Sequence, residues 1–485
     1  MLRTSTVATQ LRHDIATASL PTSRPLTVYD AVARMLIFNQ QLKAEAMARM
    51  LAEADRTLAN VDMLPQFVAS SQVYARSNQP ASSSASLANP AITGGYSISS
   101  ERVSQSRELA FSWNILDFGV SYFRSRQAAH RALIAAEQER RAAQNLIEET
   151  RVVFWRALAL QTLDEGLRRL DADMTRSIDN AGRLRAAGLT DPVEALASER
   201  DLLGIRRDLD QQRKLLVGAE QQLRALINYP PDAPLPLSRI AEPLPPSANR
   251  MSFAEIANAA LNNRPEIHQA VAEQRITAEE ARIAFLELFP NLTLAVGDTL
   301  DQNPFLLHQG WLSAASRVSW QLTKVLQYPA RSAAMERKAE LERQRTRALA
   351  VAIILQAQVS LSRLDQSQRE LRTLVQMARV QRQLTTQVEN QQSVGRAGLL
   401  AATRERMNLL LAEARRDAAY GDVQGSYANV LTSFGLDLID RAGTAGQTPD
   451  ALAARLRQAE AEAFARAPDL IRLADATPVA GEARR

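Results

Sequence analysis

Residues 111–115 read Phe-Ser-Trp-Asn-Ile, and a related stretch, Val-Ser-Trp-Gln-Leu, occupies residues 318–322. The offset of 207 residues between them is kept further along the chain. An earlier pair of segments, 26–65 and 251–290, agrees without gaps at an offset of 225 residues. Two long ungapped agreements in the same order indicate an internal duplication, and the rest of the sequence is interpreted from it.

Each copy opens with a helix-start signal. Thr27 and Ser252 are each followed three residues later by an acid, Asp30 or Glu255, which is close to a capping box. The helical pattern then runs to a proline, where an extended segment is expected to begin. The difference between the offsets, 225 − 207 = 18, places a longer loop in the first copy, within the serine-rich stretch 77–106.

Short segments after these helices alternate between apolar and small polar residues, as β-strands with two different faces do. We predict strands at about 66–76 and 107–117 in the first copy, and at about 290–300 and 312–323 in the second. Any one of these segments alone is also compatible with a half-buried hairpin of a soluble protein. The apolar set comprises Leu109, Phe111, Trp113, Ile115, Leu292, Leu294, Val296, Val318, Trp320 and Leu322.

A very long proline-free helical stretch follows the strands of each copy, over about 120–185 and 332–392. Apolar residues from Leu160 to Met174 repeat at 3–4–3–4 spacing, which is the periodicity of coiled-coil packing. About 65 residues that each rise about 1.5 Å would form a helix of roughly 100 Å. Glycines then mark the turns into returning helices, so each copy is predicted to end in a giant helical hairpin.

The organisation of the whole chain follows from the two copies. The predicted parts are an N-terminal tail (1–25), a first repeat (26–228, hairpin about 120–228), a proline-rich linker (229–250), a second repeat (251–438, hairpin about 330–434) and a C-terminal tail (439–485). The linker is expected to be ordered or semi-rigid because of its prolines. The tail is expected to contain one helical segment, about 449–467.

Composition excludes several classes of function. The 485 residues include no cysteine and four widely separated histidines, and the charge is mixed, with 58 basic and 53 acidic residues. No catalytic triad or phosphate-binding loop stands out. We therefore predict no enzyme activity, no cofactor, no metal site and no nucleic-acid partner. The longest apolar run, 348–355, is shorter than the roughly 20 residues of a membrane-spanning helix, and no secretory signal is visible in residues 1–25.

Four strands do not suffice for a closed barrel, since the smallest single-chain membrane barrels use eight. An open sheet with an apolar outer face invites aggregation at its edges. Three copies of the chain would supply twelve strands and twelve helical arms. Strands of about ten residues are long enough to cross a bilayer when tilted, so the apolar set above is predicted to face lipid and the small polar residues to line a wet lumen.

With these features, the sequence resembles the TolC-like outer-membrane efflux protein family of Gram-negative bacteria. The resemblance covers about residues 26–438. It rests on the doubled plan, the opening Leu-Thr-Val-Tyr-Asp-Ala (26–31), the approach from Ala54 to Pro65, the Ser-Trp strand pair and the glycine turns. No single motif is diagnostic; the order and spacing of all of them carry the resemblance.

The resemblance implies an α+β membrane protein: a homotrimer with a shared twelve-stranded β-barrel in outer-membrane lipid and an α-helical coiled-coil tunnel in the periplasm. It implies a passive channel of a tripartite efflux or export system, with a periplasmic adaptor (membrane fusion) protein and an inner-membrane RND or ABC pump as partners. The alternatives are an outer-membrane conduit for type I protein secretion and, from a different class, a soluble coiled-coil scaffold without a pore.

The resemblance also points to the periplasmic tips of the hairpins as the gate and as the adaptor contact. Candidate adaptor contacts are Gly188, Leu189, Gly395 and Arg396. Some members place two acidic residues six and nine positions after the second glycine, where this chain has Ala401 and Arg404. An acidic constriction would then come from Asp191 and Glu194 of the first repeat, or be absent; otherwise Asp191 is only a helix cap and Glu194 a solvated acid.

Overall fold

The computed structural model describes residues 24–83, 87, 95–188, 191–239, 252–396, 398–437 and 446–466. The chain forms two compact units, each built from separate stretches of sequence. The sheet unit comprises Ala48–Ala136 and Gln269–Thr346, and the helical unit comprises Met1–Met47, Glu137–His268 and Arg347–Arg485. Each unit therefore contains parts of both sequence repeats.

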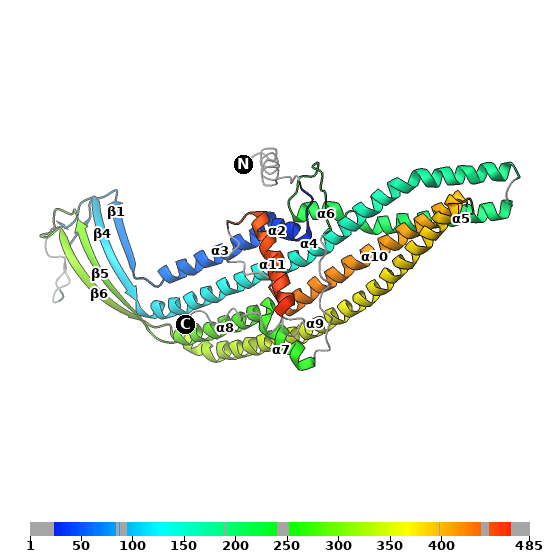
Figure 1. Cartoon of the computed structure of the whole chain (residues 1–485). Helices are drawn as coiled ribbons and strands as arrows, with labels where there is room; N and C mark the ends of the chain where they lie inside the picture. Colours follow the sequence, from blue (N-terminus) through cyan, green and yellow to red (C-terminus); the bar gives the residue numbers. More distant parts are fainter. Residues whose placement is uncertain are drawn as a thin grey trace. The chain divides into compact units, whose positions relative to one another are not determined.

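The secondary structure repeats one plan (Figure 1). The first copy contains α2 (Val28–Phe38), α3 (Gln40–Val61), β1 (Gln66–Ala75), β4 (Val103–Asn114), α4 (Ile115–Ala186), α5 (Pro192–Leu216) and α6 (Ala219–Leu226). The second contains α7 (Phe253–Asn263), α8 (Pro265–Leu286), β5 (Asn291–Asp301), β6 (Gly310–Ser319), α9 (Leu322–Ser393) and α10 (Leu399–Phe434). The longer loop of the first copy carries the short strands β2 (Ala81–Ser82) and β3 (Ser97–Ile98), and α11 (Pro449–Arg466) follows the second copy.

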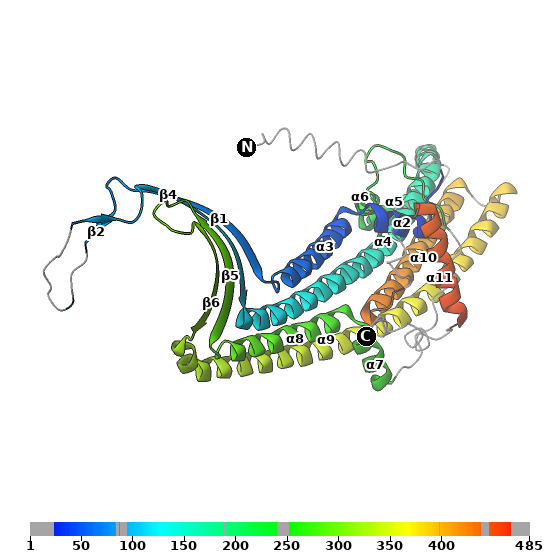
Figure 2. The same ribbon diagram turned by 90° about the vertical axis from the view of Figure 1, so that its left-hand side faces the viewer.

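The sheet unit is built around one antiparallel sheet of order β1-β4-β5-β6. Helix α3 leads into β1, β4 continues as α4, α8 leads into β5, and β6 is followed by α9 (Figure 2). Polar side chains join the helices of this unit: Gln127 of α4 donates to the carbonyl of Ile276 of α8 at 3.3 Å, and Lys338 of α9 pairs with Glu280 of α8. Helices that adjoin neighbouring strands therefore contact one another: α4 contacts α8, and α8 contacts α9.

Both capping boxes form, but the helix after each is interrupted, which corrects the single uninterrupted helix expected before each proline-marked strand. The side chains of Thr27 and Ser252 accept from the backbone of Asp30 and Glu255. Helix α2 ends at Asn39, whose amide donates to the carbonyl of Leu226 at 2.9 Å and whose oxygen caps α3. The break between α7 and α8 falls at the residue before Pro265, where helical backbone is disfavoured.

The two long helices, α4 and α9, each contain 72 residues. Helix α9 starts at Leu322, about ten residues earlier than expected, and therefore includes Pro329 near its N-terminus. The returning helices differ between the copies: Gly218, at φ +93°, separates α5 from α6, whereas α10 continues without a break. The duplication therefore conserves the outgoing helices more closely than the returning ones.

The heptad leucines form the seam that their spacing predicts. Leu163 and Leu167 of α4 are buried against Leu202 and Leu209 of α5 and Met407 of α10. Close approach of helices elsewhere in the helical unit depends on glycine. A Cβ at Gly421 or Gly425 of α10 would lie 3.0 Å from Trp155 or 2.8 Å from Val152 of α4.

Helix α11 packs against α2 in the helical unit. Its Glu460 is buried, pairs with Arg151 at 2.9 Å and accepts from the Tyr29 hydroxyl at 2.7 Å. A buried carboxylate is tolerated only when it is paired and hydrogen-bonded in this way. The helix expected near the end of the chain is thus joined to both α2 and α4.

Helix α9 contains a stretch that is long and apolar enough for a membrane-spanning helix, although no such stretch was expected from the sequence. On α9, the side chains of Ile353, Ile354 and Ala357 are buried against Val423 and Tyr427 of α10. Packing against α10 buries only one face of this helix, since 28% of the apolar stretch is buried.

Candidate functional site

The register of the sheet separates its side chains into two faces. Phe67, Phe111 and Val296 lie directly opposite one another across three strands, and Val296 pairs with Ala314 on β6. Because directly paired residues of neighbouring strands lie on one face, most of the large apolar residues gather on that face, whereas Val68, Tyr74 and Trp311 lie on the other. The other face carries mainly serine, threonine, asparagine, glutamine and alanine. One apolar and one small polar face are what the alternation in sequence predicts.

Seven of the ten residues predicted to face lipid lie within strands on the apolar face: Leu109, Phe111, Trp113, Leu292, Leu294, Val296 and Val318. The other three lie outside the strands. Ile115 and Leu322 are the first residues of α4 and α9, and Trp320 follows β6, where its indole donates to the carbonyl of Leu288 at 2.9 Å.

The strand ends predicted at 117 and 323 were therefore too late. The side chain of Asn114 accepts from the backbone of Asp117 at 3.0 Å and so caps α4 immediately after β4. Alternation continues for a residue or two into the first helical turn, so the period of the sequence does not mark this boundary.

Two left-handed glycines form the turns at the ends of the long helices. Gly188 has φ +69° and Gly395 has φ +74°. The backbone amides of Gly395 and Arg396 donate to the carbonyls of Gln392 and Gln391 at 3.0 and 2.8 Å, which is the Schellman arrangement of a helix C-terminus. Leu189, the remaining candidate adaptor contact, lies outside the described residues.

The candidate constriction residues separate into different environments. Asp191 caps α5 by accepting from the amide of Val193 at 3.0 Å. Ala401 is half-buried on α10, and the guanidinium of Arg404 donates to Glu405 at 3.1 Å. Glu405 is buried and also accepts from Gln381 of α9 at 2.8 Å. Glu194 belongs to α5, and its side chain is outside the described residues.

The sequence model of the outer membrane efflux protein family matches residues 32–229. Over these residues the chain is similar to members of that family.

Solved channel structures share its fold over most of the chain. The outer-membrane channel OprN is 17% identical, with a TM-score of 0.64 over 87% of this chain and 95% of that one. The CmeC outer membrane channel of Campylobacter jejuni is 12% identical, with a TM-score of 0.64 over 89% of each chain. The open-state MtrE outer membrane channel of Neisseria gonorrhoeae is 16% identical, with a TM-score of 0.61 over 84% of this chain and 89% of that one. Among curated protein sequences, none matches at a significant level.

A polar network that the sequence did not reveal joins the helices near their tips. Arg406 of α10 donates to Glu389 of α9 at 2.7 Å and lies 3.6 Å from Asp173 of α4. Nearby, the hydroxyls of Ser177 and Thr403 meet at 2.7 Å in a buried contact between α4 and α10. These residues follow no motif, and only the packing of three helices brings them together.

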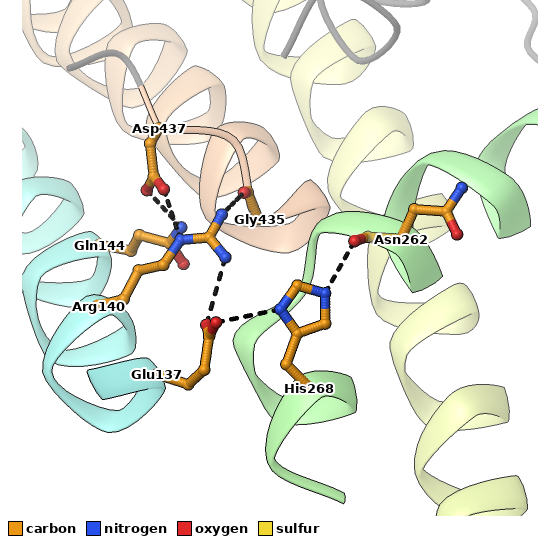
Figure 3. Close-up of polar contacts among 7 residues, drawn as sticks. All are labelled: Glu137, Arg140, Gln144, Asn262, His268, Gly435 and Asp437. Atoms are coloured by element: carbon orange, nitrogen blue, oxygen red, sulfur yellow. Dashed lines mark hydrogen bonds and ion pairs between the residues drawn. The ribbon is translucent and has the colours of Figure 1, made fainter. Parts of the chain in front are cut away.

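A second cluster missed at the sequence level surrounds His268 on α8 (Figure 3). Its Nδ1 lies 3.1 Å from Glu137 of α4, and its Nε2 lies 3.0 Å from the carbonyl of Asn262. Arg140 of α4 pairs with Glu137 and with Asp437, beyond the end of α10. Because both ring nitrogens face oxygen acceptors, the doubly protonated imidazolium fits this site best.

The pKa values of this cluster are shifted accordingly. The hydrogen bond to Glu137 raises the pKa of His268 above 6.5, although burial opposes it. Burial raises the pKa of Glu137, but the hydrogen bond from His268 and the charge of Arg140 outweigh it and leave that pKa below 4.5. The histidine therefore stabilises the fold fully below pH 6.5 and loses this effect as the pH rises through its raised pKa. The carboxylate contributes above pH 4.5 and loses its effect as the pH falls through its lowered pKa.

We expect His268→Gln to lower the melting temperature more at pH 5.5 than at pH 8.5, by about 2 °C or more, because only the acidic sample holds the full cation–carboxylate contact. The measurement is thermal unfolding followed by circular dichroism in detergent. His130→Gln is the control, since burial lowers the pKa of His130. Its replacement should therefore raise the melting temperature at pH 5.5 relative to that at pH 8.5. An equal loss at both pH values would contradict the role given to the charged histidine.

We expect Gly395→Ala to destabilise the protein by about 1 kcal/mol, since a left-handed backbone penalises a Cβ even where space is open. A Cβ at Gly395 would meet nothing within 4 Å. Gly182 inside α4 has equally open surroundings, so Gly182→Ala should instead stabilise by about 1 kcal/mol through helix propensity. Denaturant midpoints of the two variants should move in opposite directions, and movement in the same direction would refute the backbone argument.

Proposed function

We propose that this chain is the outer-membrane channel of an efflux system and that three copies pool their sheets into one twelve-stranded barrel. The observation that carries the proposal is the open sheet. Its edge strands β1 and β6 pair on one side only within the described part of the chain, and its apolar face leaves Phe67, Leu312 and Val318 each more than two-thirds exposed. Unpaired strand edges and an exposed apolar face are unfavourable in water. A closed barrel in lipid would pair the edges and place the apolar face against the lipid.

Strand length supports the same arrangement. The four strands contain 10, 12, 11 and 10 residues, and a tilted strand crosses a bilayer in about 9–11 residues. Trp113 lies near the helix-proximal end of β4, Trp320 directly follows β6, and both are more than one-third exposed. Tryptophan prefers the membrane–water interface, so these two side chains would mark the periplasmic boundary of the bilayer.

The long helices also carry apolar side chains that a single chain leaves uncovered. Val351, Leu355 and Val359 recur at intervals of four on α9 and are about half exposed. Residues at that spacing share one helix face, and a neighbouring copy would bury them in a tunnel of twelve helices. The exposed apolar face of the sheet makes a soluble coiled-coil scaffold the poorer alternative.

Partners follow from the same proposal. A periplasmic adaptor protein would contact the tip turns at Gly188, Leu189, Gly395 and Arg396, and an RND or ABC pump in the inner membrane would supply the energy. Export of proteins through a type I secretion system is the second candidate, since the described residues of the tip turns favour neither cargo.

The gate is proposed to lie at these tips. The cap contact of Asp191 supports a structural role for that residue, whereas Glu194, one turn further along α5, is left as the acid that would face a constriction. Arg404 is engaged by Glu405, which argues against a free basic ring at that position.

Light scattering of the detergent-extracted protein, with the detergent share subtracted, should give about 3 × 53.5 ≈ 160 kDa. The protein should be recovered only from the outer-membrane fraction. A monomer or dimer that stays soluble without detergent would refute the shared barrel, since four strands alone have no means of closing.

Glu194→Gln should lower the preference of single channels for K⁺ over Cl⁻, measured as the reversal potential across a planar bilayer with a salt gradient. Glu199→Gln is the matched control on the same helix, because the carboxylate of Glu199 is paired with Arg185 at 3.6 Å. Unchanged selectivity in Glu194→Gln, in channels that conduct normally, would remove Glu194 from the gate.

A further inference from the structure

A narrow slot lies inside the helical unit. Helices α2, α4, α10 and α11 form its walls, and the residues just after α10 also line it. Its volume is about 50 Å³, several times the roughly 10–15 Å³ that one water molecule needs. All of these elements belong to one chain and one unit, so the slot does not depend on the barrel proposed above.

The walls of the slot are largely hydrocarbon. Val28, Val32 and Leu36 recur at intervals of four residues and therefore line the slot with one face of α2. Ala143 of α4 and Ala428 of α10 also line it and are almost fully buried. Because each of these two side chains is a single methyl group, they leave space that larger residues would fill. Water is a poor occupant of such a space, since a buried water needs about two to four polar partners.

The charged side chains that line the slot are Arg151, Asp437 and Glu460, and each of them has a partner of opposite charge. At one end of the slot, Glu460 pairs with Arg151 at 2.9 Å. At the other end, Asp437 pairs with Arg140 and accepts from Gln144 at 2.7 Å. A further charge buried here would have no counter-charge of its own and would be costly. Charge complementarity therefore favours an uncharged occupant.

The spacing of the two polar ends sets the shape of the occupant. Gln144 and Arg151 lie seven residues apart on α4, which corresponds to roughly 10 Å along the helix. Ile147 lines the slot between them. A slot that is long but small in volume must be narrow, so an extended alkyl chain fits it better than a ring does.

We propose that this slot binds one uncharged, single-chain aliphatic molecule, such as a medium-chain alcohol. The bound chain contacts α2, α4, α10 and α11 at once. It thereby stabilises the docking of α11 on the helical unit, because its burial removes apolar surface from water.

Photolabelling tests this site directly. The full-length protein, in detergent-free lipid nanodiscs, is irradiated with the photoreactive alcohol 3-azioctanol, and the labelled residues are identified by mass spectrometry of its peptides. We expect label on Leu36, Ile147 and Leu456, which line the slot from three different helices. Excess 1-octanol should prevent this labelling. Octanoate and octylamine have the same chain length but carry a charge, and they should compete far less.

Filling the slot should remove the label. Ala143→Val and Ala428→Val add methyl groups from two different helices, and each should lower the labelling on the order of tenfold, as expected when contacts of roughly two methylene groups are lost. Ala142→Val is the matched control on α4, because Ala142 is half-buried and does not line the slot; it should leave the labelling unchanged. Circular dichroism checks that each variant is folded, and either filling variant suffices for the comparison.

Label found only outside the slot, or slot label that persists in a folded filling variant, would overturn the site. Competition by octanoate or octylamine that equals or exceeds that of 1-octanol would overturn the uncharged occupant. The positions of the label in the parent protein decide the first point even when no filling variant folds.

Discussion

The constraint on which this structure depends is the hydrogen bonding of its outermost strands. A strand edge left unpaired is costly in lipid and prone to aggregation in water. One chain supplies four strands, with β1 and β6 at the edges, and no arrangement of four strands closes. In the proposed assembly, each copy would contribute its helices to the tunnel as it contributes its strands to the barrel, so both parts would need the same number of copies.

Two kinds of periodicity follow one another along the chain, the alternation of the strands and the heptad spacing of the helices. The extended backbone ends at Asn114, whose side chain caps α4, although the alternation of residue types continues into the first helical turn. Where helices must approach closely, as α10 approaches α4, glycines at 421 and 425 remove the side chain that would clash. Apolar packing supplies the stability, while glycine and the caps decide where each element stops.

Polar groups inside the helical unit serve a different purpose. His268, Glu137 and Arg140 join α8, α4 and the end of α10, and Glu460 joins α11 to α2 and α4. Pairs of this kind contribute less to stability than apolar packing of equal volume, yet they penalise any register that separates them. The protonation of His268 makes this contact between the two repeats depend on pH, because the imidazolium that pairs with Glu137 is lost as the pH rises.

The sequence alone determined the duplication, the strand faces and the coiled-coil helices, because each follows from a regular spacing of residues along the chain. It also located the turns, since a left-handed backbone demands glycine at Gly188 and Gly395. Only the tertiary structure decided which charges are free. Glu405 accepts from Gln381 of α9, and Glu460 pairs with Arg151 of α4 and accepts from Tyr29 of α2. Such roles depend on residues far away in the chain, and no spacing within one strand or helix encodes them.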